Sequence, residues 1–494
     1  MAKQEEPYLA RLYPSSPKDV LIDLYLGKSL SDLPTPSAIL DLAAVRRNCE
    51  RMLSACSGLG LQWRAHVKTH KTAEITRLQV GDDPATPAQI VVSTLEEAEF
   101  LLPLLKEYHA QGRAVNVLYG LPIAPGRMAR LAAIGDALGH GSISVLVDHP
   151  AQLEHLARFF GNQETAAHTV PRVYIKVDMG GRRAGVEVGS ESFRAVTDAA
   201  LAAHDAGAVV LAGMYSHAGH SYGGDSRTTA VTMMTAELDA LVKGADAVVQ
   251  AAMARLSSQR RHLPPLVLSA GASPTALAVQ NLLSSPQAAG LPSDLVSATT
   301  TLSALFQEIK SKGHVAEIHA GVYPLLDMQQ LAVHSVSSAL ASWRDVAMTV
   351  LSEICSTYPG RGHDGKTSEA LCGAGGLALG REFCKAYLGM AVVHPWGRKG
   401  ADGKPLALPD CDVESFEGWI VGRFSQEHGI LTWHAPDGQG SGKPDEFEIG
   451  QKVQLWPNHA CITSSHFGWY FVIDSDLKGR EDEVVDIYIK TRGW

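Results

Sequence analysis

Short apolar segments alternate with longer helical segments over residues 35–330, and this alternation restricts the possible folds more than any other feature of the sequence. The predicted strands are 36–41, a strand that includes Lys68, 89–93, 114–119, 143–148, 172–178, 208–216, 265–269 and 314–318, and the predicted helices are 42–59, 71–80, 96–108, 150–160, 190–206, 226–256 and 274–284. Strands that alternate with helices predict β-α units and a parallel sheet. About eight such units have the size of a single (β/α)8 barrel. A doubly wound open sheet is the alternative, but we favour the barrel because polar, glycine-rich motifs follow many successive strands rather than one switch point.

The sequence changes character at about residue 340. From there on it contains short strand candidates, many turns and few helix signals, which predicts a second, mostly antiparallel β domain. The strand candidates are 346–354, 419–424, 430–434, 453–455, 470–473 and 484–489, and the segments 357–368 and 395–412 are predicted loops. We therefore expect an N-terminal arm (1–34) that packs on the β domain, a TIM-like barrel (35–340) and a C-terminal β domain (341–494).

Charge and composition argue against several classes of function. Lysine and arginine number 43 against 52 aspartates and glutamates, and the net charge of −9 argues against nucleic acid or an anionic membrane as the main partner. No secretory signal and no apolar stretch long enough for a membrane span is visible. Seven cysteines without C-x-x-C spacing fit a reducing compartment. We expect a cytoplasmic enzyme with a small-molecule substrate.

Lys68 is the first candidate for chemistry. Residues 64–71 read Arg-Ala-His-Val-Lys-Thr-His-Lys, and strand alternation would place His66 and His70 on the same face as Lys68. Lys68 is either a solvated lysine at a strand end, the more frequent state for this residue, or a desolvated amine that forms a Schiff base with an aldehyde cofactor. The residues nearby leave both interpretations open, and they assign no role to His66 or His70.

Two later turns have the composition of phosphate-binding loops. Residues 268–275 follow a predicted strand and precede a helix, with hydroxyls at Ser273 and Thr275 and a helix N-terminus that favours an anion. Residues 317–323 place Gly321 after a late strand, where barrels often bind phosphate. The alternatives are a simple helix cap and an ordinary glycine turn.

Two strand ends in the middle of the predicted barrel carry candidates for contact with a ring. Residues 176–185 contain Arg183, which could meet a ring nitrogen or a carboxylate, or could lie in a solvated surface loop. Residues 215–222 begin with Tyr215, end with Tyr222 and include two histidines, which suits ring contact and proton handling. A buried core tyrosine is the alternative.

His459 and Cys461 lie two residues apart in the predicted β domain, so on a strand or an extended loop both side chains would face the same way. Imidazole and thiolate suit Zn²⁺. With only these two ligands visible, the site would be an open zinc site completed by water and substrate, rather than a closed structural one. An isolated His-x-Cys is more often without function.

Four motifs, taken together and in order, resemble the eukaryotic (fungal-type) D-serine dehydratase / D-threonine aldolase family, whose members use pyridoxal phosphate on an alanine-racemase-like fold. The motifs are 66–71, 215–222, 425–429 and 457–461, and the resemblance covers the chain from about Thr35 to its C-terminus. It implies that Lys68 holds pyridoxal phosphate through a Schiff base and acts as the base at Cα. It further implies ring contacts from Arg183 and Tyr215, and cofactor contacts from Tyr222, Ser273, Gly321, Val322 and Tyr323.

The resemblance also implies that His459 and Cys461 bind Zn²⁺ beside the substrate. In D-threonine aldolases the second metal position is acidic, so a cysteine there resembles the zinc-dependent D-serine dehydratases. The implied reaction is loss of water from D-serine, or a related β-hydroxy-D-amino acid, to give pyruvate (a 2-oxo acid) and ammonia. Retro-aldol cleavage to glycine and an aldehyde, and a pyridoxal-phosphate-binding protein without activity, are the alternatives. A head-to-tail homodimer is expected, and the family's proline before His66 is Ala65 here.

Overall fold

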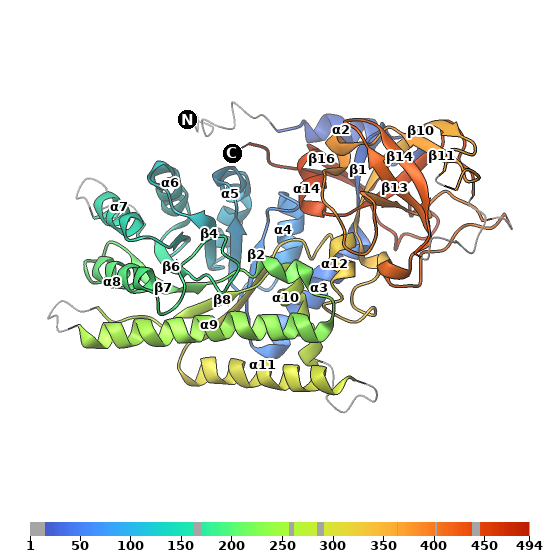
Figure 1. Cartoon of the computed structure of the whole chain (residues 1–494). Helices are drawn as coiled ribbons and strands as arrows, with labels where there is room; N and C mark the ends of the chain where they lie inside the picture. Colours follow the sequence, from blue (N-terminus) through green and yellow to red (C-terminus); the bar gives the residue numbers. More distant parts are fainter. Residues whose placement is uncertain are drawn as a thin grey trace, which may run out of the picture. The chain divides into compact units, whose positions relative to one another are not determined.

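The computed structural model describes residues 15–161, 169–255, 261–283, 291–362, 364–400, 403–436 and 445–493, and the chain divides into two compact units. The first unit is built on residues 50–321. The second combines residues 15–49 with residues 322–492. Figure 1 labels many of the helices and strands of both units. Residues 1–14 of the predicted arm lie outside the described residues.

The first unit is a closed barrel of eight parallel strands, which confirms the predicted fold class. Its strands are β2 (Gln62–His66), β3 (Ala88–Val92), β4 (Val115–Pro122), β5 (Ile143–Val147), β6 (Arg172–Lys176), β7 (Val210–Tyr215), β8 (Val267–Ala270) and β9 (Val315–Ala320). Each strand pairs with the next in the sequence, and β9 pairs with β2 to close the ring. An open doubly wound sheet would have left β2 and β9 unpaired with each other.

The helices of this unit begin at predictable caps. They are α3 (Leu42–Leu59, which starts in the second unit), α4 (Ala73–Val80), α5 (Leu95–Ala110), α6 (Met128–Leu138), α7 (Pro150–Phe160), α8 (Glu191–Asp205), α9 (Arg227–Ala254), α10 (Ser273–Ala278) and α11 (Ser293–Ser311). Thr72, Thr94, Ser190 and Ser226 each accept a hydrogen bond from the backbone N–H three residues later, which satisfies a donor that the helix leaves unpaired. The sequence analysis predicted neither α6 nor α11. Figure 1 shows α9 and α11 side by side, as their contacts require.

The interior of the barrel has an apolar layer and a polar layer. The apolar cluster contains Val91, Leu118, Leu146, Tyr174, Ala212, Tyr215 and Val267. The polar layer centres on Arg64, which is 1% exposed and donates to Glu317 Oε1 (2.7 Å) and to Asn116 Oδ1 (2.7 Å). Arg64 lies on β2 and Glu317 on β9, so this ion pair crosses the strand pair that closes the barrel.

The second unit is built around a ring of six antiparallel strands. These are β10 (Met348–Tyr358), β11 (Glu369–Cys372), β12 (Ala391–Val393), β13 (Gly418–Phe424), β14 (Gly429–His434) and β15 (Lys452–Pro457). They pair in the order β10–β11–β14–β13–β12–β15, and β15 returns to β10. The prediction of a mostly antiparallel β domain is confirmed, although β11 and β12 were not predicted.

Residues 36–41 are not the first barrel strand that the sequence analysis predicted. Strand β1 (Ser37–Asp41) pairs antiparallel with β10 and parallel with β16 (Trp469–Ile473), which pairs in turn with β17 (Asp486–Ile489). A short apolar strand has the same local pattern in either unit, so only its distant partners decide where it belongs. The helix α2 (Lys18–Tyr25) places Leu21 in the same core cluster as Phe471.

The barrel unit ends at Gly321, earlier than the predicted boundary at residue 340. Residues 322–345 instead belong to the second unit, where Asp327 accepts a hydrogen bond from the N–H of Ala460 (2.8 Å) and caps the short helix α12 (Met328–Ala332). The prediction placed the boundary where the composition of the sequence next changes. The structure places it where residues begin to contact the second unit rather than the barrel.

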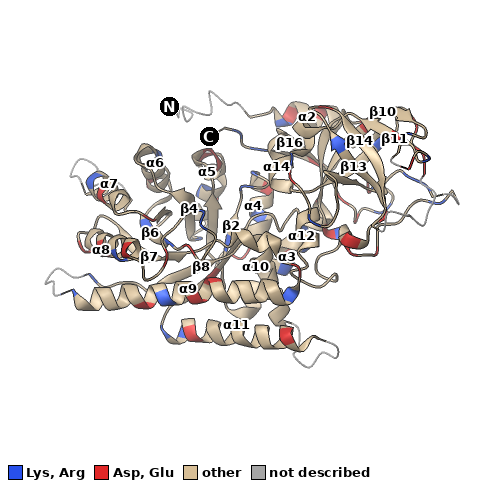
Figure 2. Cartoon of the chain, in the orientation of Figure 1, with Lys and Arg blue, Asp and Glu red and all other residues tan. Residues whose placement is uncertain are grey.

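Charged residues of both signs are interspersed along α9 and α11, as Figure 2 shows. None of the helices in the described part of the chain is long and apolar enough to cross a membrane.

Candidate active site

The barrel brings most of the predicted site residues to one rim. In a closed parallel barrel all strands end on the same side. Lys68 follows β2, Arg183 follows β6, and Tyr215 is the last residue of β7. Tyr222, Ser273 and Gly321 lie in the segments after β7, β8 and β9.

Lys68 lies in a turn after β2, so the predicted strand through it is wrong. The strand ends at His66, and the N–H of Lys71 donates to the carbonyl of Val67 (2.9 Å) to close the turn over residues 68–70. Lys68 itself is half-buried, and its N–H lies 3.4 Å from His66 Nδ1. A turn interrupts the alternation of side chains, so the three residues do not share a face as the strand pattern suggested.

His70 and Lys71 instead take part in local packing. His70 is fully buried, with Nε2 2.8 Å from Gln79 Oε1 on α4 and Nδ1 3.2 Å from Thr72 Oγ1. Lys71 forms an ion pair with the buried Glu97 (3.1 Å). His66, whose Nδ1 faces the Lys68 N–H, lies beside Lys68.

Three imidazoles gather near Lys68 on this rim. Loss of hydration lowers the pKa of His66, His217 and His319 well below the usual value, and the positive charge of Lys68 lowers the pKa of His66 and His217 further. All three are therefore neutral at neutral pH. His217 Nδ1 lies 2.7 Å from the carbonyl oxygen of Gly271, so Nδ1 carries the proton and Nε2 keeps its lone pair.

Tyr215 lies between an imidazole and an ammonium group. Its ring stacks on that of His319 with centroids 4.2 Å apart and an interplanar angle of 12°. Lys176 Nζ is 4.9 Å from the Tyr215 ring centroid, and burial lowers the pKa of Lys176 to about 8. Burial raises the pKa of Tyr215, so its hydroxyl stays protonated and can donate a hydrogen bond.

Arg183 is exposed, yet its charge reaches the same cluster. It contributes to the lowered pKa of His217, and a Cβ added at Gly219 would lie 3.8 Å from Arg183 Nη1. The arginine therefore reaches the loop after β7. Tyr222 is half-buried in a 3₁₀ turn of that loop (Gly219–Gly223).

The turns after β8 and β9 lie close to neighbouring backbone. Gly271 has φ +147°, and a Cβ there would lie 2.1 Å from the carbonyl oxygen of His319, so only glycine fits. Ser273 is 4% exposed and is the first residue of α10, whose N-cap is Ala272, so Ser273 is not the plain cap that the sequence allowed. A Cβ at Gly321 would lie 3.2 Å from the carbonyl oxygen of His66.

The remaining candidates belong to the second unit and are described by themselves. Val322 and Tyr323 are its first residues after the barrel, and both are buried. His459 is the N-cap of α14 (Ala460–Ser465), and Cys461 lies in the first turn of this helix, not on a strand. Loss of hydration lowers the pKa of His459, but hydrogen bonding to Cys461 and its charge raise it to a net value of about 9.

This pair fits a partial metal site. The imidazole and the thiol are in hydrogen-bond contact, and Glu382 Oε2 lies 3.6 Å from His459 Nδ1. Among the described residues no group of three or more histidine, cysteine, aspartate or glutamate side chains has the arrangement of a metal site. The donors are those that Zn²⁺ prefers, and their number leaves positions for water or substrate.

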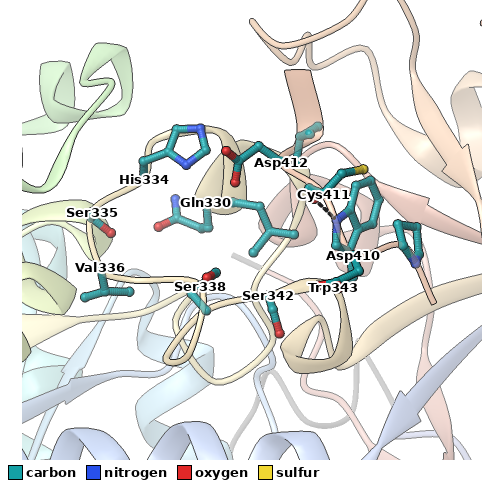
Figure 3. A pocket seen from close by; sticks show the side chains of 14 residues that line it. Gln330, His334, Ser335, Val336, Ser338, Ser342, Trp343, Asp410, Cys411 and Asp412 are labelled. Atoms are coloured by element: carbon teal, nitrogen blue, oxygen red, sulfur yellow. Dashed lines mark hydrogen bonds between the residues drawn. The ribbon is translucent and has the colours of Figure 1, made fainter. Parts of the chain in front are cut away.

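A separate cavity of about 270 Å³ lies in the second unit (Figure 3). Gln330, Trp343 and residues 410–412 of the loop 395–412 contribute to its wall. Trp343 Nε1 donates to the carbonyl oxygen of Cys411 (2.7 Å), the dashed line in Figure 3, and so fixes this part of the loop. None of the site residues predicted from the sequence lines it.

Sequence reasoning missed several residues of the rim. Lys176 and His319 stood inside quoted motifs but received no role, and His217 was noted only as one of two histidines suited to proton handling. Glu237 stood inside a predicted helix without attracting notice. A polar residue within a run of buried apolar residues was the available signal for Lys176 and His319.

Comparisons with known proteins give a consistent result. Residues 347–473 match the family described as "Putative serine dehydratase domain", and residues 40–286 match "Alanine racemase, N-terminal domain". The chain is similar to the D-serine dehydratase of Schizosaccharomyces pombe, with 34% identity over 100% of both chains. It is also similar to that of Saccharomyces cerevisiae, with 30% identity over 96% of this chain and 99% of the other.

Among solved structures, D-threo-3-hydroxyaspartate dehydratase from Delftia sp. HT23 superimposes with a TM-score of 0.67 and 26% identity, covering 94% of this chain and 100% of the other. Structures of D-threo-3-hydroxyaspartate dehydratase also exist for a histidine-to-alanine variant and for a cysteine-to-alanine variant in a metal-free form. The two altered positions are two residues apart.

Proposed function

Because this chain belongs to the D-serine dehydratase family of lyases, we propose that it uses pyridoxal phosphate and Zn²⁺ to remove water from D-serine or a related β-hydroxy-D-amino acid. The products are a 2-oxo acid, pyruvate in the case of D-serine, and ammonia. The observation that carries the proposal is the position of Lys68 on the barrel rim, near the neutral imidazoles of His66 and His217, in a chain related over its full length to D-serine dehydratases.

Lys68 is the residue that would hold pyridoxal phosphate. Bound to an amino acid, this cofactor withdraws electrons from Cα and so makes the Cα proton acidic. The amine of Lys68 takes that proton. His66 and His217, being neutral, can orient polar groups without adding positive charge that would compete with protonation of Lys68.

Ring and phosphate would be held by residues of the same rim. Tyr215, protonated and packed against His319, offers a hydrogen-bond donor to the ring, and Arg183 offers a charge beside it. The phosphate would be held at this rim by Tyr222, Ser273 and Gly321. Gly271 lets the loop that carries Ser273 pass close to β9, because any side chain there would collide with backbone.

His459 and Cys461 would hold Zn²⁺. A zinc ion supplies a Lewis acid that makes the β-hydroxyl of the substrate a better leaving group. Support comes from D-threo-3-hydroxyaspartate dehydratase, whose cysteine-to-alanine variant was solved in a metal-free form and in which a histidine two residues away was also replaced. The same spacing separates His459 from Cys461.

Substrate turnover tests the proposal. Purified protein supplied with pyridoxal phosphate and zinc should form pyruvate from D-serine, and a chelator should stop the reaction until zinc is restored. Glycine and acetaldehyde from D-threonine, without pyruvate from D-serine, would identify an aldolase instead. Cofactor binding without either activity would identify a non-catalytic binding protein.

Variants of Lys68 test the assignment of the cofactor. Lys68→Ala and Lys68→Arg should both lose the visible absorbance near about 420 nm that a pyridoxal phosphate Schiff base produces. Lys106→Ala, which alters an exposed lysine of α5, should keep it. A band that survives in both Lys68 variants would refute the assignment.

A further inference from the structure

Glu237 lies within α9 with its side chain fully buried, although no step of the proposed reaction uses it. Removing a carboxylate from water costs several kcal/mol unless hydrogen-bond donors replace its hydration. The helix packs on β7, β8 and α10, so Glu237 can reach the loops at the ends of these strands. The donors around its carboxylate therefore identify what it holds in place.

Donors from two loops converge on this carboxylate. Oε1 accepts hydrogen bonds from the backbone N–H of Ala218 (2.8 Å) and of Gly271 (3.3 Å). Oε2 accepts one from Thr275 Oγ1 (3.3 Å). Ala218 belongs to the loop after β7, whereas Gly271 and Thr275 belong to the segment after β8. One side chain thus joins two neighbouring loops.

Other contacts make these loops depend on each other. His217, next to Ala218, donates from Nδ1 to the carbonyl oxygen of Gly271 (2.7 Å). Gly271 cannot shift toward β9, because the His319 carbonyl already lies against it. Burial raises the pKa of Glu237, whereas Lys176 and the N–H donors of Gly271 and Ala218 lower it. The buried acid is therefore held by hydrogen bonds that only a fixed arrangement of both loops provides.

We propose that Glu237 is a positioning residue, which fixes the loops after β7 and β8 so that Tyr222 and Ser273 are arranged to hold the phosphate of pyridoxal phosphate. The inference rests on the proposed function, since it requires this cofactor at the rim. Glu237 acts through loop backbone and through Thr275. Its removal should therefore weaken the hold on the phosphate more than the hold on the ring.

Comparison of two cofactors isolates this effect. Pyridoxal and pyridoxal phosphate both react with Lys68, but only the second carries a phosphate. The dissociation constant of pyridoxal divided by that of pyridoxal phosphate therefore measures how much the phosphate contributes to binding. We expect Glu237→Ala to lower this ratio at least about tenfold, as loss of roughly one to two hydrogen bonds would. Absorbance titration of cofactor-free protein with each compound gives both constants.

Conservative variants separate hydrogen bonding from charge. In Glu237→Gln the amide oxygen can accept from Ala218 and Gly271, and the amide N–H can donate to Thr275 Oγ1, so the ratio should stay within about threefold of wild type. Leu241→Ala, which shortens a buried apolar side chain on the same helix, is the matched control for general loosening and should leave the ratio unchanged. If Glu237→Ala does not fold, Thr275→Val, compared with Thr275→Ser, tests the same contact and should lower the ratio.

The outcomes separate this inference from the proposed function. An unchanged ratio in both Glu237→Ala and Thr275→Val would overturn the inference while leaving the function intact. The inference would also be overturned if Leu241→Ala lowered the ratio as much as Glu237→Ala does. The same holds if Glu237→Gln lowered the ratio as much as Glu237→Ala does. If the wild-type protein showed no measurable binding of pyridoxal phosphate, the proposed function would be refuted, and the inference with it.

Discussion

The ion pair between Arg64 and Glu317 offers a direct test of how the barrel is closed. Both side chains are buried, at 1% and 0% exposure, and Arg64 Nε lies 2.7 Å from Glu317 Oε1. Replacing Arg64 by methionine removes the guanidinium but keeps an unbranched side chain in the space. Glu317 would then be a buried carboxylate without its cation, and Asn116 Oδ1 would lose a charged donor.

The expected magnitude follows from this geometry. Breaking a buried ion pair by removing one partner costs about 3–5 kcal/mol, because the other charge stays buried. Replacing both partners by apolar groups is often nearly neutral. We therefore expect Arg64→Met to destabilise the barrel by about 4 kcal/mol, and the double variant Arg64→Met/Glu317→Leu to recover at least about 2 kcal/mol of that loss.

Hydrogen–deuterium exchange followed by mass spectrometry measures this locally. Peptides that contain β2 and β9 should exchange about a thousandfold faster in Arg64→Met than in wild type, since each 1.4 kcal/mol is a factor of ten. The control is Arg77→Met, which breaks an ion pair to Glu107 in which both side chains are 44% exposed. That exposed pair should contribute less than about 1 kcal/mol.

Two results would contradict the reasoning. If Arg64→Met exchanged no faster than Arg77→Met, the buried pair would not stabilise barrel closure. If the double variant were less stable than Arg64→Met alone, the uncompensated charge of Glu317 would not be the cause of the loss.

Three further predictions concern the candidate site and the second unit. Cys461→Ala should keep the absorbance near about 420 nm but lose zinc-dependent pyruvate formation; loss of both would assign the cysteine a structural role. Gly271→Ala should weaken cofactor binding by at least about tenfold, because the new Cβ would lie 2.1 Å from the His319 carbonyl oxygen. Cofactor titration measures this, and a folded variant that binds the cofactor with wild-type affinity would contradict it. Loss of hydration and the charge of Arg398 lower the pKa of His394 to about 3, so only the unfolded chain takes up this proton as the pH falls below the usual value of 6.5. Wild type should therefore lose about 2 kcal/mol more unfolding free energy than His394→Asn between pH 7 and pH 5, measured by denaturant titration, and equal losses would exclude this origin.

The β-α order of the barrel could be predicted because each unit repeats a local pattern. Apolar strands and capped helices are visible within a few residues, and a threonine or serine cap marks the start of α4, α5, α8 and α9. Helices α6 and α11 were missed, and β1 was assigned to the wrong unit. The error with β1 arose because a short apolar strand does not specify its partner.

The candidate site was predictable in its composition but only partly in its geometry. Ser273 and Gly321 were identified because they follow strand candidates, and every parallel strand of a barrel ends on the same rim. Lys68 was identified by the histidines two residues away on each side, within a predicted strand. The turn at Lys68 was not predicted, because the alternating pattern of residues 64–67 was extended through residues 68–70, which are all polar. His459 and Cys461 were identified by their spacing, although a helix start, and not a strand, brings their side chains together.

By itself, the sequence determined the fold class, the order of the units and the kinds of chemical group available, because these depend on local patterns and on motifs of a few residues. Only the tertiary structure decided which groups meet. Tyr215 and His319 stack from strands β7 and β9, and Arg64 pairs with Glu317 from 253 residues away. Glu237, an unremarked residue of a long helix, accepts hydrogen bonds from two loops at the rim. Such contacts form when the barrel closes. Closure depends on pairing between strands that are distant in the sequence, and no local pattern specifies that pairing, so the sequence does not reveal these contacts.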